Sequence, residues 1–378
     1  CVDSVQIAAA AYGVPKPNFY LDTTCIKVAD TLQFYASDPT ATTWLWNFGD
    51  GITSTLQNPP HVYSDFGYFC VSLMASNACG DSSLTQTIYV QDKNCPCDTA
   101  FQIENGWTVL GSDTLDFTTF GTNIVKVKGD IVITSGSSLF IQLAEIQMHP
   151  TSRIIVERGA NLSLLECRLT SLNDCGMWHG IEVWGSTDSS SFAGENGKVQ
   201  LFGGVHIDNA PIGILSGKRN MDYACDPGSG YKFDLDYSGG IVDAHNLSYS
   251  SCIFTNNGID IEFTRKNVSE GSANQISGLY FVGTSQLQDA HYNTNHFDFY
   301  PNSHNPWTGH ANQYQRGEAG ILVENTDGFN VNYCIFRNKQ IGILSFDSKY
   351  NVFESEFKQM VWGIRIQNTI TNIGKRHE

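Results

Sequence analysis

Charged residues are scarce in this sequence, and basic residues are the scarcest of them. Asp, Glu, Lys and Arg make up 16% of the 378 residues, and 22 Lys and Arg stand against 38 Asp and Glu, which gives a net charge of −16. No basic stripe interrupts this acidic background. Because nucleic acids are bound mainly through basic surfaces, we expect no nucleic-acid partner.

Long hydrophobic segments are missing as well. No run of 18 apolar residues occurs, so the sequence predicts no membrane-spanning helix. The N-terminus lacks the basic, apolar and small-residue zones of a signal peptide. The sequence starts at Cys1 and stops directly after a strand-like segment, so we expect it to be a segment of a longer chain.

Glycine and aromatic residues, in contrast, are abundant. The chain has 35 Gly and 12% aromatic residues, beside many Ser, Thr and Asn. This composition is typical of strands and turns, and it predicts an all-β protein. A chain of this length exceeds one ordinary core, so it forms either several domains or an elongated repeat domain.

The stretch WLWNFGDG, residues 44–51, is typical of a strand buried on one side. Trp44, Trp46 and Phe48 have the same parity, so in a strand their rings lie on one face. The following Gly-Asp-Gly predicts a tight turn in which Asp50 is a turn former, rather than a metal ligand or catalytic group. Short alternating segments surround this stretch, and they indicate a β-sandwich over residues 20–91.

This segment resembles the PKD domain, an immunoglobulin-like sandwich of surface proteins. The resemblance rests on the run from Trp46 to Gly51, on NPPHVY at 58–63 and on FGY at 66–68. In the strand layout that it implies, Cys25 opens the second strand and Cys79 follows the sixth, at the same end of the sandwich. We therefore expect a Cys25–Cys79 disulfide, as in other oxidised extracellular domains.

A repeat of about 22 residues begins near residue 124. GDIVITSGSSLFI recurs 23 residues later as SRIIVERGANLSL, and Gly320, Gly342 and Gly363 are spaced by 22 and 21 residues. One β-rich coil per repeat resembles the right-handed parallel β-helix. We expect residues 1–19 to be a linker or the end of a preceding module, 92–123 a linker and cap, and 124–378 the β-helix.

Aligned repeats predict which side chains point into the coil. Small or thiol residues stand two positions before large apolar ones, in the pairs Cys167/Leu169, Val205/Ile207, Cys252/Phe254, Cys334/Phe336 and Ser355/Phe357. Amides follow two positions later, at Asn209, Asn256, Asn338 and Gln359. We expect Cys167, Cys252 and Cys334 to be buried thiols, and the amides to form a hydrogen-bonded column at a corner. The pairing of Cys1, Cys70, Cys95, Cys97, Cys175 and Cys225 stays open.

Glycan cleavage needs two carboxyl groups projecting outward from neighbouring coils. The outward position after the repeat Gly-Ile reads Glu182, Leu215, Glu262, Leu322, Leu344 and Arg365, with no carboxylates on adjacent coils. A second outward column, Arg168, His206, Ile253, Ile335 and Glu356, does not place two carboxylates together either. We therefore predict no catalytic residues and a non-enzymatic module; the alternative is a polysaccharide lyase or glycoside hydrolase with its catalytic groups in insertions.

The insertion at 289–316 is the strongest candidate for ligand binding. It is rich in aromatic residues and amides, a composition suited to sugars, and we expect Tyr300, Trp307 and Tyr314 to contact a glycan. The alternative is that these rings pack the insertion onto the coil. A neutral polysaccharide or a protein partner suits the negative chain better than an acidic glycan does. We expect no cofactor or metal site, although Asp234 and Asp236 leave calcium possible beside the alternative of a solvated turn.

A PKD sandwich followed by a β-helix is similar to large surface proteins of Bacteroidota exported by the type IX secretion system. The resemblance implies an extracellular or cell-surface adhesive or structural module joined to further modules, with a glycan or protein partner. In that phylum Asp-Ser/Thr motifs accept O-glycans, which implies possible glycosylation at Ser4, Thr23, Thr31, Thr99 and Thr114. Simple surface turns are the alternative for each of these motifs.

Overall fold

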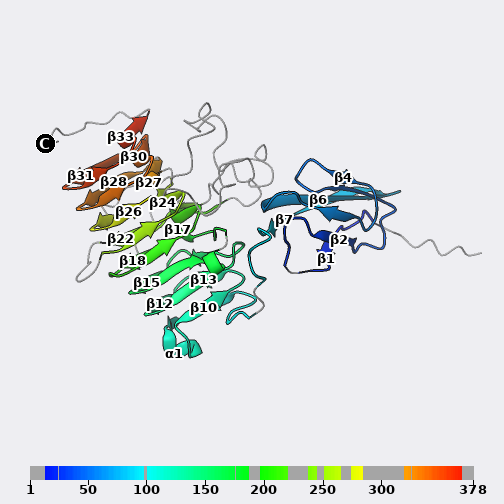
Figure 1. Ribbon diagram of the computed structural model, residues 1–378, viewed down its shortest axis with the longest axis horizontal. Coiled ribbons are helices and arrows are strands. Elements are labelled where there is room, and N and C mark those ends of the chain that lie inside the picture. Colours follow the sequence, from blue (N-terminus) through cyan, green and yellow to red (C-terminus); the bar gives the residue numbers. More distant parts are fainter. Residues whose placement is uncertain are drawn as a thin grey trace, which may run out of the picture. The chain divides into compact units, whose positions relative to one another are not determined.

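The computed structural model describes residues 13–23, 25–97, 100–174, 176–186, 196–219, 237–244, 251–264, 274–283, 319–324 and 326–367. The chain divides into two compact units, Cys1–Asn94 and Cys95–Glu378 (Figure 1). Both units are built from strands; the described helices are α1 (Phe117–Phe120) and the 3₁₀ turn η1 (Leu172–Asp174). Within the described residues, no helix is long and apolar enough to cross a bilayer.

The N-terminal unit is a sandwich of two antiparallel sheets. One sheet has the order β1 (Phe19–Leu21), β2 (Thr31–Ala36), β5 (Pro60–Val62). The other has the order β4 (Thr53–Ser54), β3 (Thr43–Asn47), β6 (Gly67–Asn77), β7 (Gly80–Val90). The fold of this unit agrees with the immunoglobulin-like sandwich that the resemblance implied.

Rings from both sheets form the core between them. Trp46 and Phe48 are 0% and 1% exposed, and Trp44 of the same parity packs against this core while staying half-buried. The Phe34 ring of the facing sheet lies 5.6 Å from Trp46 and 5.1 Å from Phe48. The one-sided strand predicted from the sequence is therefore confirmed.

Asp50 closes the turn after β3 and also contacts a buried histidine. Its Oδ1 accepts a hydrogen bond from the Ile52 N–H at 3.0 Å, as expected of a turn former. Its Oδ2 lies 2.8 Å from Nε2 of His61, whose ring stacks on Phe48 at 3.9 Å. The carboxylate thus fastens the turn to the aromatic core.

The predicted Cys25–Cys79 disulfide is wrong. Cys25 lies in a disulfide, but Cys79 keeps its thiol and is exposed. Cys79 sits in the β6–β7 hairpin, where Asn77 pairs with Gly80. Lys27, two residues after Cys25, instead forms an isolated bridge with Gln91, just past the far end of β7. At about 3.3 Å per residue, the length of β7 keeps the two cysteines roughly 35 Å apart.

Three other cysteines of the first hundred residues are oxidised. Cys70, Cys95 and Cys97 all lie in disulfides, although the sequence offered no evident partner for any of them. Cys70 lies within β6, whereas Cys95 and Cys97 follow β7. Disulfides stabilise a fold mainly by restricting the unfolded chain. Cys1, Cys175 and Cys225 lie outside the described residues.

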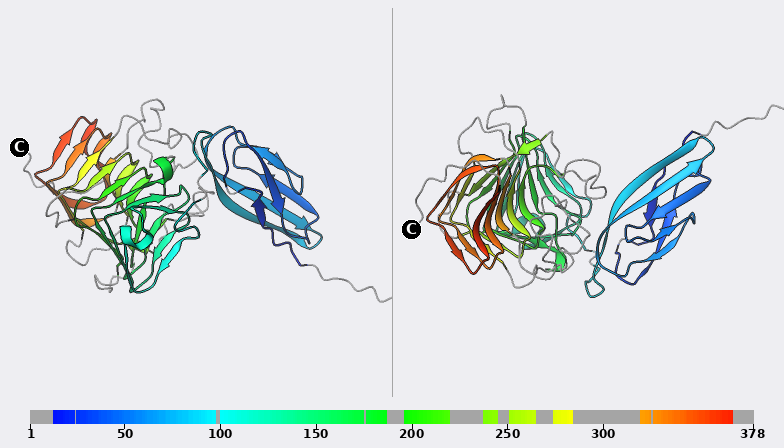
Figure 2. Two further views of the ribbon diagram at one scale, coloured as in Figure 1. Left: turned by 60° about the horizontal axis from the view of Figure 1, so that its bottom comes forward. Right: turned by 90° about the horizontal axis from the view of Figure 1, so that it is seen from above.

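The C-terminal unit is a parallel β-helix with three sheets (Figure 2). Sheet 1 contains β8 (Trp107–Val109), β11 (Ile131–Ile133), β14 (Ile154–Val156), β17 (Ile181–Ser186), β20 (Ile212–Ser216), β24 (Ile259–Phe263), β27 (Ala319–Glu324), β30 (Ile341–Phe346) and β33 (Trp362–Gln367). Sheet 2 contains β9 (Ser112–Leu115), β12 (Ser138–Gln142), β15 (Asn161–Leu165), β18 (Lys198–Leu201), β22 (Ile241–Ala244), β25 (Gln275–Ser277), β28 (Asp327–Asn332) and β31 (Lys349–Phe353). Sheet 3 contains β10 (Ile124–Val127), β13 (Glu145–Met148), β16 (Arg168–Ser171), β19 (His206–Asp208), β23 (Ile253–Thr255), β26 (Tyr280–Val282), β29 (Ile335–Arg337) and β32 (Glu356–Lys358).

The strand registers agree with the spacing of the repeats. Ile131 pairs with Ile154 and Ser138 with Asn161, both 23 residues apart, as the first pair of repeats predicted. The coil starts earlier than expected, because β8 and β9 already pair in parallel with β11 and β12. The β-helix therefore begins at Trp107, inside the segment where we expected a linker and a cap.

Aromatic rings stack through the interior from coil to coil. The Phe254, Phe281, Phe336 and Phe357 rings follow one another with centroids 5.4, 4.6 and 4.8 Å apart. Phe281 was missing from the predicted column, and β26 supplies it. The predicted pairs of inward side chains are otherwise in register, and they form one continuous core.

The amide column occupies a corner where the backbone is left-handed. Asn209, Asn256, Asn338 and Gln359 have φ between 54° and 58°. Asparagine tolerates this conformation better than other residues with a Cβ, and the Asn256 Nδ2 donates a hydrogen bond to the Asn209 Oδ1. The predicted hydrogen-bonded column is therefore confirmed for these two residues.

The three cysteines of the coil keep their thiols, as predicted. Cys167, Cys252 and Cys334 are 4%, 0% and 0% exposed. Burial raises their pKa values to about 12, 11 and 12. They remain neutral at physiological pH and pack as small apolar side chains.

Candidate functional site

The outward column of sheet 1 that contains Glu182 is largely buried, whereas the outward column of sheet 3 that contains Arg168 is more exposed. The column of sheet 1 has the predicted register, with Glu182 beside Leu215, Leu215 beside Glu262 and Glu262 beside Leu322. Glu182, Leu215 and Glu262 are 0% exposed, and Leu322 and Leu344 are 1% and 5% exposed. Corresponding side chains of sheet 3 are half-buried or exposed, including Arg168, His206 and Glu356.

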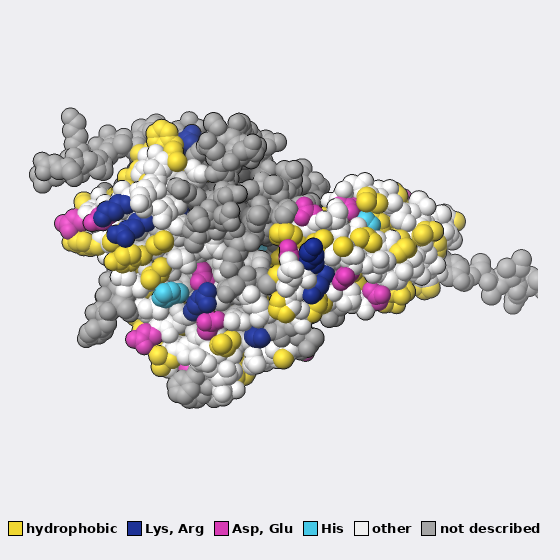
Figure 3. Space-filling view, in the orientation of Figure 1, with side chains coloured by type: hydrophobic (Ala, Val, Ile, Leu, Met, Phe, Trp, Pro, Cys, Tyr) yellow, Lys and Arg dark blue, Asp and Glu magenta, His cyan; other side chains and the backbone are white. Residues whose placement is uncertain are grey.

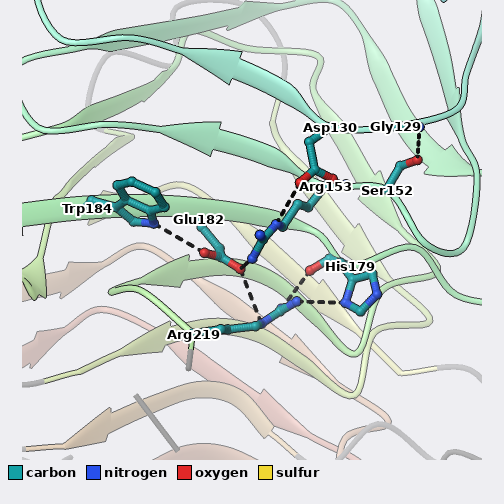
Figure 4. A network of polar contacts seen from close by, with 8 residues as sticks. All are labelled: Gly129, Asp130, Ser152, Arg153, His179, Glu182, Trp184 and Arg219. Carbon is teal, nitrogen blue, oxygen red and sulfur yellow. Dashed lines mark hydrogen bonds and ion pairs between the residues drawn. The ribbon is translucent and has the colours of Figure 1, made fainter. Parts of the chain in front are cut away.

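Glu182 is the centre of a buried network of ion pairs (Figure 4). Its Oε1 accepts a hydrogen bond from Nη1 of Arg153 at 2.8 Å, and it lies 3.7 Å from Nε of Arg219. Arg153 also donates from Nε to Oδ2 of Asp130 at 3.1 Å. Both arginines therefore place positive charge beside this buried carboxylate, which lessens the cost of removing it from water.

The other oxygen of Glu182 is occupied by a tryptophan. Nε1 of Trp184 donates to Oε2 at 3.2 Å, so the same carboxylate orients an aromatic ring of the outer surface. Burial by itself lowers the pKa of Arg153, but Glu182 and Asp130 outweigh it and the pKa is raised. Arg153 therefore keeps its positive charge at physiological pH.

Arg219 joins this network to a buried histidine. Its Nη2 donates to the backbone oxygen of His179 at 2.6 Å, and its Nη1 lies 3.1 Å from Nδ1 of that ring. Burial, and then the charges of Arg219 and Arg153, lower the pKa of His179 well below its usual value. The neutral imidazole accepts a hydrogen bond from the guanidinium, which is a positioning contact.

A second buried ion pair lies inside the coil. Asp260 occupies the column where neighbouring coils have Gly320 and Gly342, and both of its oxygens lie 2.9 Å from Nζ of Lys339. Nδ2 of Asn257 also donates to Asp260, at 3.0 Å. Burial raises the pKa of Asp260 to about 6, although Lys339 and Asn257 act against it. Lys339 thereby links two coils through polar contacts in an otherwise apolar interior.

The residues predicted to bind a glycan or calcium lie outside the described residues. This applies to Tyr300, Trp307 and Tyr314, and to Asp234 and Asp236. Among the described residues, no group of three or more His, Cys, Asp or Glu side chains is placed to hold a metal ion.

The predicted glycosylation sites divide in the same way. Ser4 and Thr99 lie outside the described residues. Thr31 and Thr114 are exposed, whereas the half-buried Thr23 donates its hydroxyl to the Cys25 carbonyl oxygen at 3.0 Å. Thr31 and Thr114 therefore present accessible hydroxyl groups.

Sequence reasoning did not find the partners of Glu182. Arg153 precedes a strand of sheet 1, and Arg219 follows one, so no repeat spacing connects them. The available signal was Glu182 itself, since an acidic side chain within the apolar strand IEVWGS needs buried compensation. An acidic residue in such a strand indicates that basic side chains lie nearby, but it does not indicate which residues supply them.

Sequence comparison identifies the N-terminal unit. The family described as the PKD domain matches residues 14–91. Residues 14–91 form a PKD domain. The match supports the resemblance stated for residues 20–91.

Curated relatives share only a short segment with this chain. Collagenase ColA of Bacillus cereus is 42% identical over 66 residues, which are 16% of this chain and 7% of the relative. Polycystin-1-like protein 1 of Oryzias latipes is 43% identical over 54 residues, 14% of this chain and 2% of the relative. The chain thus spans a small fraction of the length of these relatives.

A solved structure with the same kind of domain is the PKD1 domain of the Vibrio cholerae metalloprotease PrtV. It is 30% identical, it covers 20% of this chain and 96% of its own, and its TM-score is 0.18.

Proposed function

We propose that this protein is an extracellular binding or structural module that presents a surface of its β-helix and has no catalytic activity. Its partner is a glycan or a protein at the cell surface, and its PKD domain connects the β-helix to other modules. The proposal includes an origin among type IX secretion substrates of Bacteroidota. It also includes O-glycans at exposed Asp-Thr motifs such as those of Thr31 and Thr114.

Oxidised cysteines support the extracellular location. Cys25, Cys70, Cys95 and Cys97 are in disulfides, which persist in oxidising compartments and are rare in the cytosol. A PKD domain is typical of extracellular proteins, which agrees with this placement.

The observation that carries the proposal is the state of Glu182. Glycosidases and lyases need a carboxyl group that reaches the substrate and exchanges a proton with it. Glu182 is 0% exposed, and its oxygens already contact Arg153, Arg219 and Trp184. Glu262, two coils further in the same column, is also 0% exposed. We infer that Glu182 and Glu262 stabilise the fold and take no part in a reaction.

A turnover assay tests the proposal against the enzymatic alternative. The purified 378-residue chain is incubated with neutral and acidic polysaccharides, and released oligosaccharides are quantified by reducing-end analysis and mass spectrometry. We expect no release above a heat-denatured control. Reproducible release that is abolished by substitution of one carboxylate would show a polysaccharide lyase or glycoside hydrolase instead.

A further inference from the structure

Two aromatic rings and two cations form a cluster on the outside of sheet 1. The Trp184 and Tyr237 rings meet edge to face, with centroids 5.2 Å apart. Nζ of Lys218 lies 4.7 Å from the Trp184 ring and 3.8 Å from the Tyr237 ring, and the Arg158 guanidinium lies 4.6 Å from the Tyr237 ring. We call these four residues the cation–aromatic cluster.

Close backbone packing fixes the position of this cluster. Strand β21 (Tyr237–Gly239) pairs antiparallel with β17, so that Trp184 lies opposite Gly239 and Ser186 opposite Tyr237. A Cβ at Gly185 would lie 2.3 Å from the Gly239 carbonyl oxygen, and one at Gly239 would lie 2.4 Å from Oγ of Ser216. Glycine at these positions allows three chain segments to meet, and the rings project from a rigid base.

The buried network beneath the cluster restrains the tryptophan further. Trp184 donates its indole N–H to Glu182, and Glu182 is held by Arg153 and Arg219 (Figure 4). The indole N–H of Trp184 therefore already has a hydrogen-bond acceptor, the Glu182 carboxylate. Rings and cations that are held in advance lose little conformational entropy when a ligand binds.

The cluster brings cations together in a chain that is acidic overall. Charged side chains are sparse among the coloured residues of Figure 3, and the sequence has 38 acidic against 22 basic residues. Arg158 is exposed, and it makes no hydrogen bond or ion pair within the part of the chain that the structure describes. Its planar group is ordered on the Tyr237 ring while its donors stay available to a ligand.

We propose that the cation–aromatic cluster binds an anionic saccharide, a glycan that carries carboxylate or sulfate groups. Arg158 receives the anionic group through paired hydrogen bonds, Lys218 adds a second positive charge, and the half-buried Trp184 ring contacts the C–H surface of the sugar. This inference rests on the proposed function and specifies its ligand. The ligand differs from the neutral polysaccharide that the sequence suggested for the insertion at 289–316.

Other ligand classes match the cluster less well. A neutral sugar offers no counter-charge to Arg158 and Lys218. A nucleic acid carries a charge on every phosphate, and the net charge of −16 would oppose such a dense polyanion. An acidic peptide satisfies the cations but has no regular C–H surface for the rings, so it serves as the comparison in the test.

The test measures binding of the full chain to four probes by isothermal titration calorimetry. These are a uronic acid oligosaccharide, a sulfated dextran fragment, a neutral dextran fragment and an oligoglutamate peptide. We expect binding of the uronate or the sulfated probe, and their relative affinity identifies the anionic group. Neutral dextran and oligoglutamate should bind at least about tenfold more weakly, because each lacks one of the two recognition elements.

Two substitutions in the cluster are compared with one elsewhere in the same unit. Arg158→Gln and Lys218→Gln each remove a cation that lies over a ring, and each should weaken binding of the anionic saccharide by about tenfold or more. The matched control is Lys128→Gln, because Nζ of Lys128 lies 5.8 Å from the Phe101 ring away from this cluster. The control should change affinity by less than about twofold. Circular dichroism checks that all three variants are folded.

The outcomes separate this inference from the proposed function. Unchanged affinity in both cluster variants, equal affinity for oligoglutamate, or no binding of either anionic saccharide overturns the inference. Binding of a neutral glycan alone overturns it too, but leaves the proposed binding function in place. Cleavage of the uronate probe would overturn the non-enzymatic function, while the affinities of the variants would still decide whether the cluster is the binding site.

Discussion

The Phe357 ring lies directly against the Cα of Gly342. A Cβ at Gly342 would fall 2.5 Å from the ring and 2.5 Å from the Gly363 carbonyl oxygen. The Phe336 ring has the same relation to Gly320, with 2.6 Å to the position of a Cβ. The repeated glycine of the sequence is therefore explained by the column of phenylalanine rings that packs against it.

We predict that Gly342→Ala destabilises the β-helix by about 1–3 kcal/mol or more, because neither the ring nor the backbone oxygen can move freely. The control is Gly363→Ala, where the nearest atom would be Phe357 Cγ at 3.4 Å, an ordinary contact. Urea unfolding followed by circular dichroism measures both variants. Equal midpoints for the two would show that the rings do not require this glycine.

The Glu182 network gives a second prediction. Glu182→Gln removes the charge that compensates Arg153 and Arg219, and we expect it to lower the free energy of unfolding by about 3–5 kcal/mol. Glu145→Gln is the control, since the Glu145–Arg168 pair is 3.5 Å long and its side chains are 27% and 37% exposed. Glu145→Gln should lower the free energy of unfolding by less than about 1 kcal/mol. A small effect at Glu182 would contradict a compensating role for the carboxylate.

The repeat could be predicted from the sequence because each coil restates the same spacing. Inward residues such as Phe254 and Phe336, and corner amides such as Asn256, recur at matched positions, and their register follows from that recurrence. The first coil was missed because Trp107–Val109 and Ser112–Leu115 are short, and because two residues separate them where four separate Ile133 from Ser138 in the next coil. Pattern reasoning works where neighbours along the coil resemble one another.

Features that join unrelated segments could not be predicted in this way. The partner of Cys25 depends on the direction and length of β7, which place Cys79 at the opposite end. The cation–aromatic cluster combines Arg158 from a turn with Lys218 and Tyr237 from either side of an insertion. No periodicity links these residues, so only the three-dimensional fold brings them together.

The cysteines provide a third prediction, which native alkylation measures. Iodoacetamide added to the folded protein without reductant should label Cys79, which is exposed, and spare Cys167, Cys252 and Cys334. Burial excludes the reagent from these three and raises their pKa values to about 12, 11 and 12, which suppresses the reactive thiolate. All four should react after denaturation. Labelling of Cys252 or Cys334 in the folded protein would show that the coil register is wrong.

The last prediction concerns acid stability and His149. Burial, and then the charge of Lys128, lower the pKa of His149 to about 4, against an ordinary value near 6.5. Between these two pH values the unfolded chain binds a proton at His149 that the folded protein does not bind. The contribution of His149 to the free energy of unfolding is therefore complete above pH 6.5, and it is lost as the pH falls towards 4. Asp260, with its pKa raised to about 6, acts in the opposite direction and is left unchanged by the substitution.

We therefore expect His149→Gln to reduce the loss of stability between pH 7 and pH 5 by roughly 1–2 kcal/mol relative to the wild type. Urea unfolding at the two pH values measures this difference directly, and it cancels every titration that the two proteins share. His206→Gln on the exposed face of β19 is the control, and it should keep the pH dependence of the wild type. If His149→Gln also keeps the pH dependence of the wild type, other groups cause the loss of stability in acid. The buried His179 is then the next residue to test, because its pKa is also lowered.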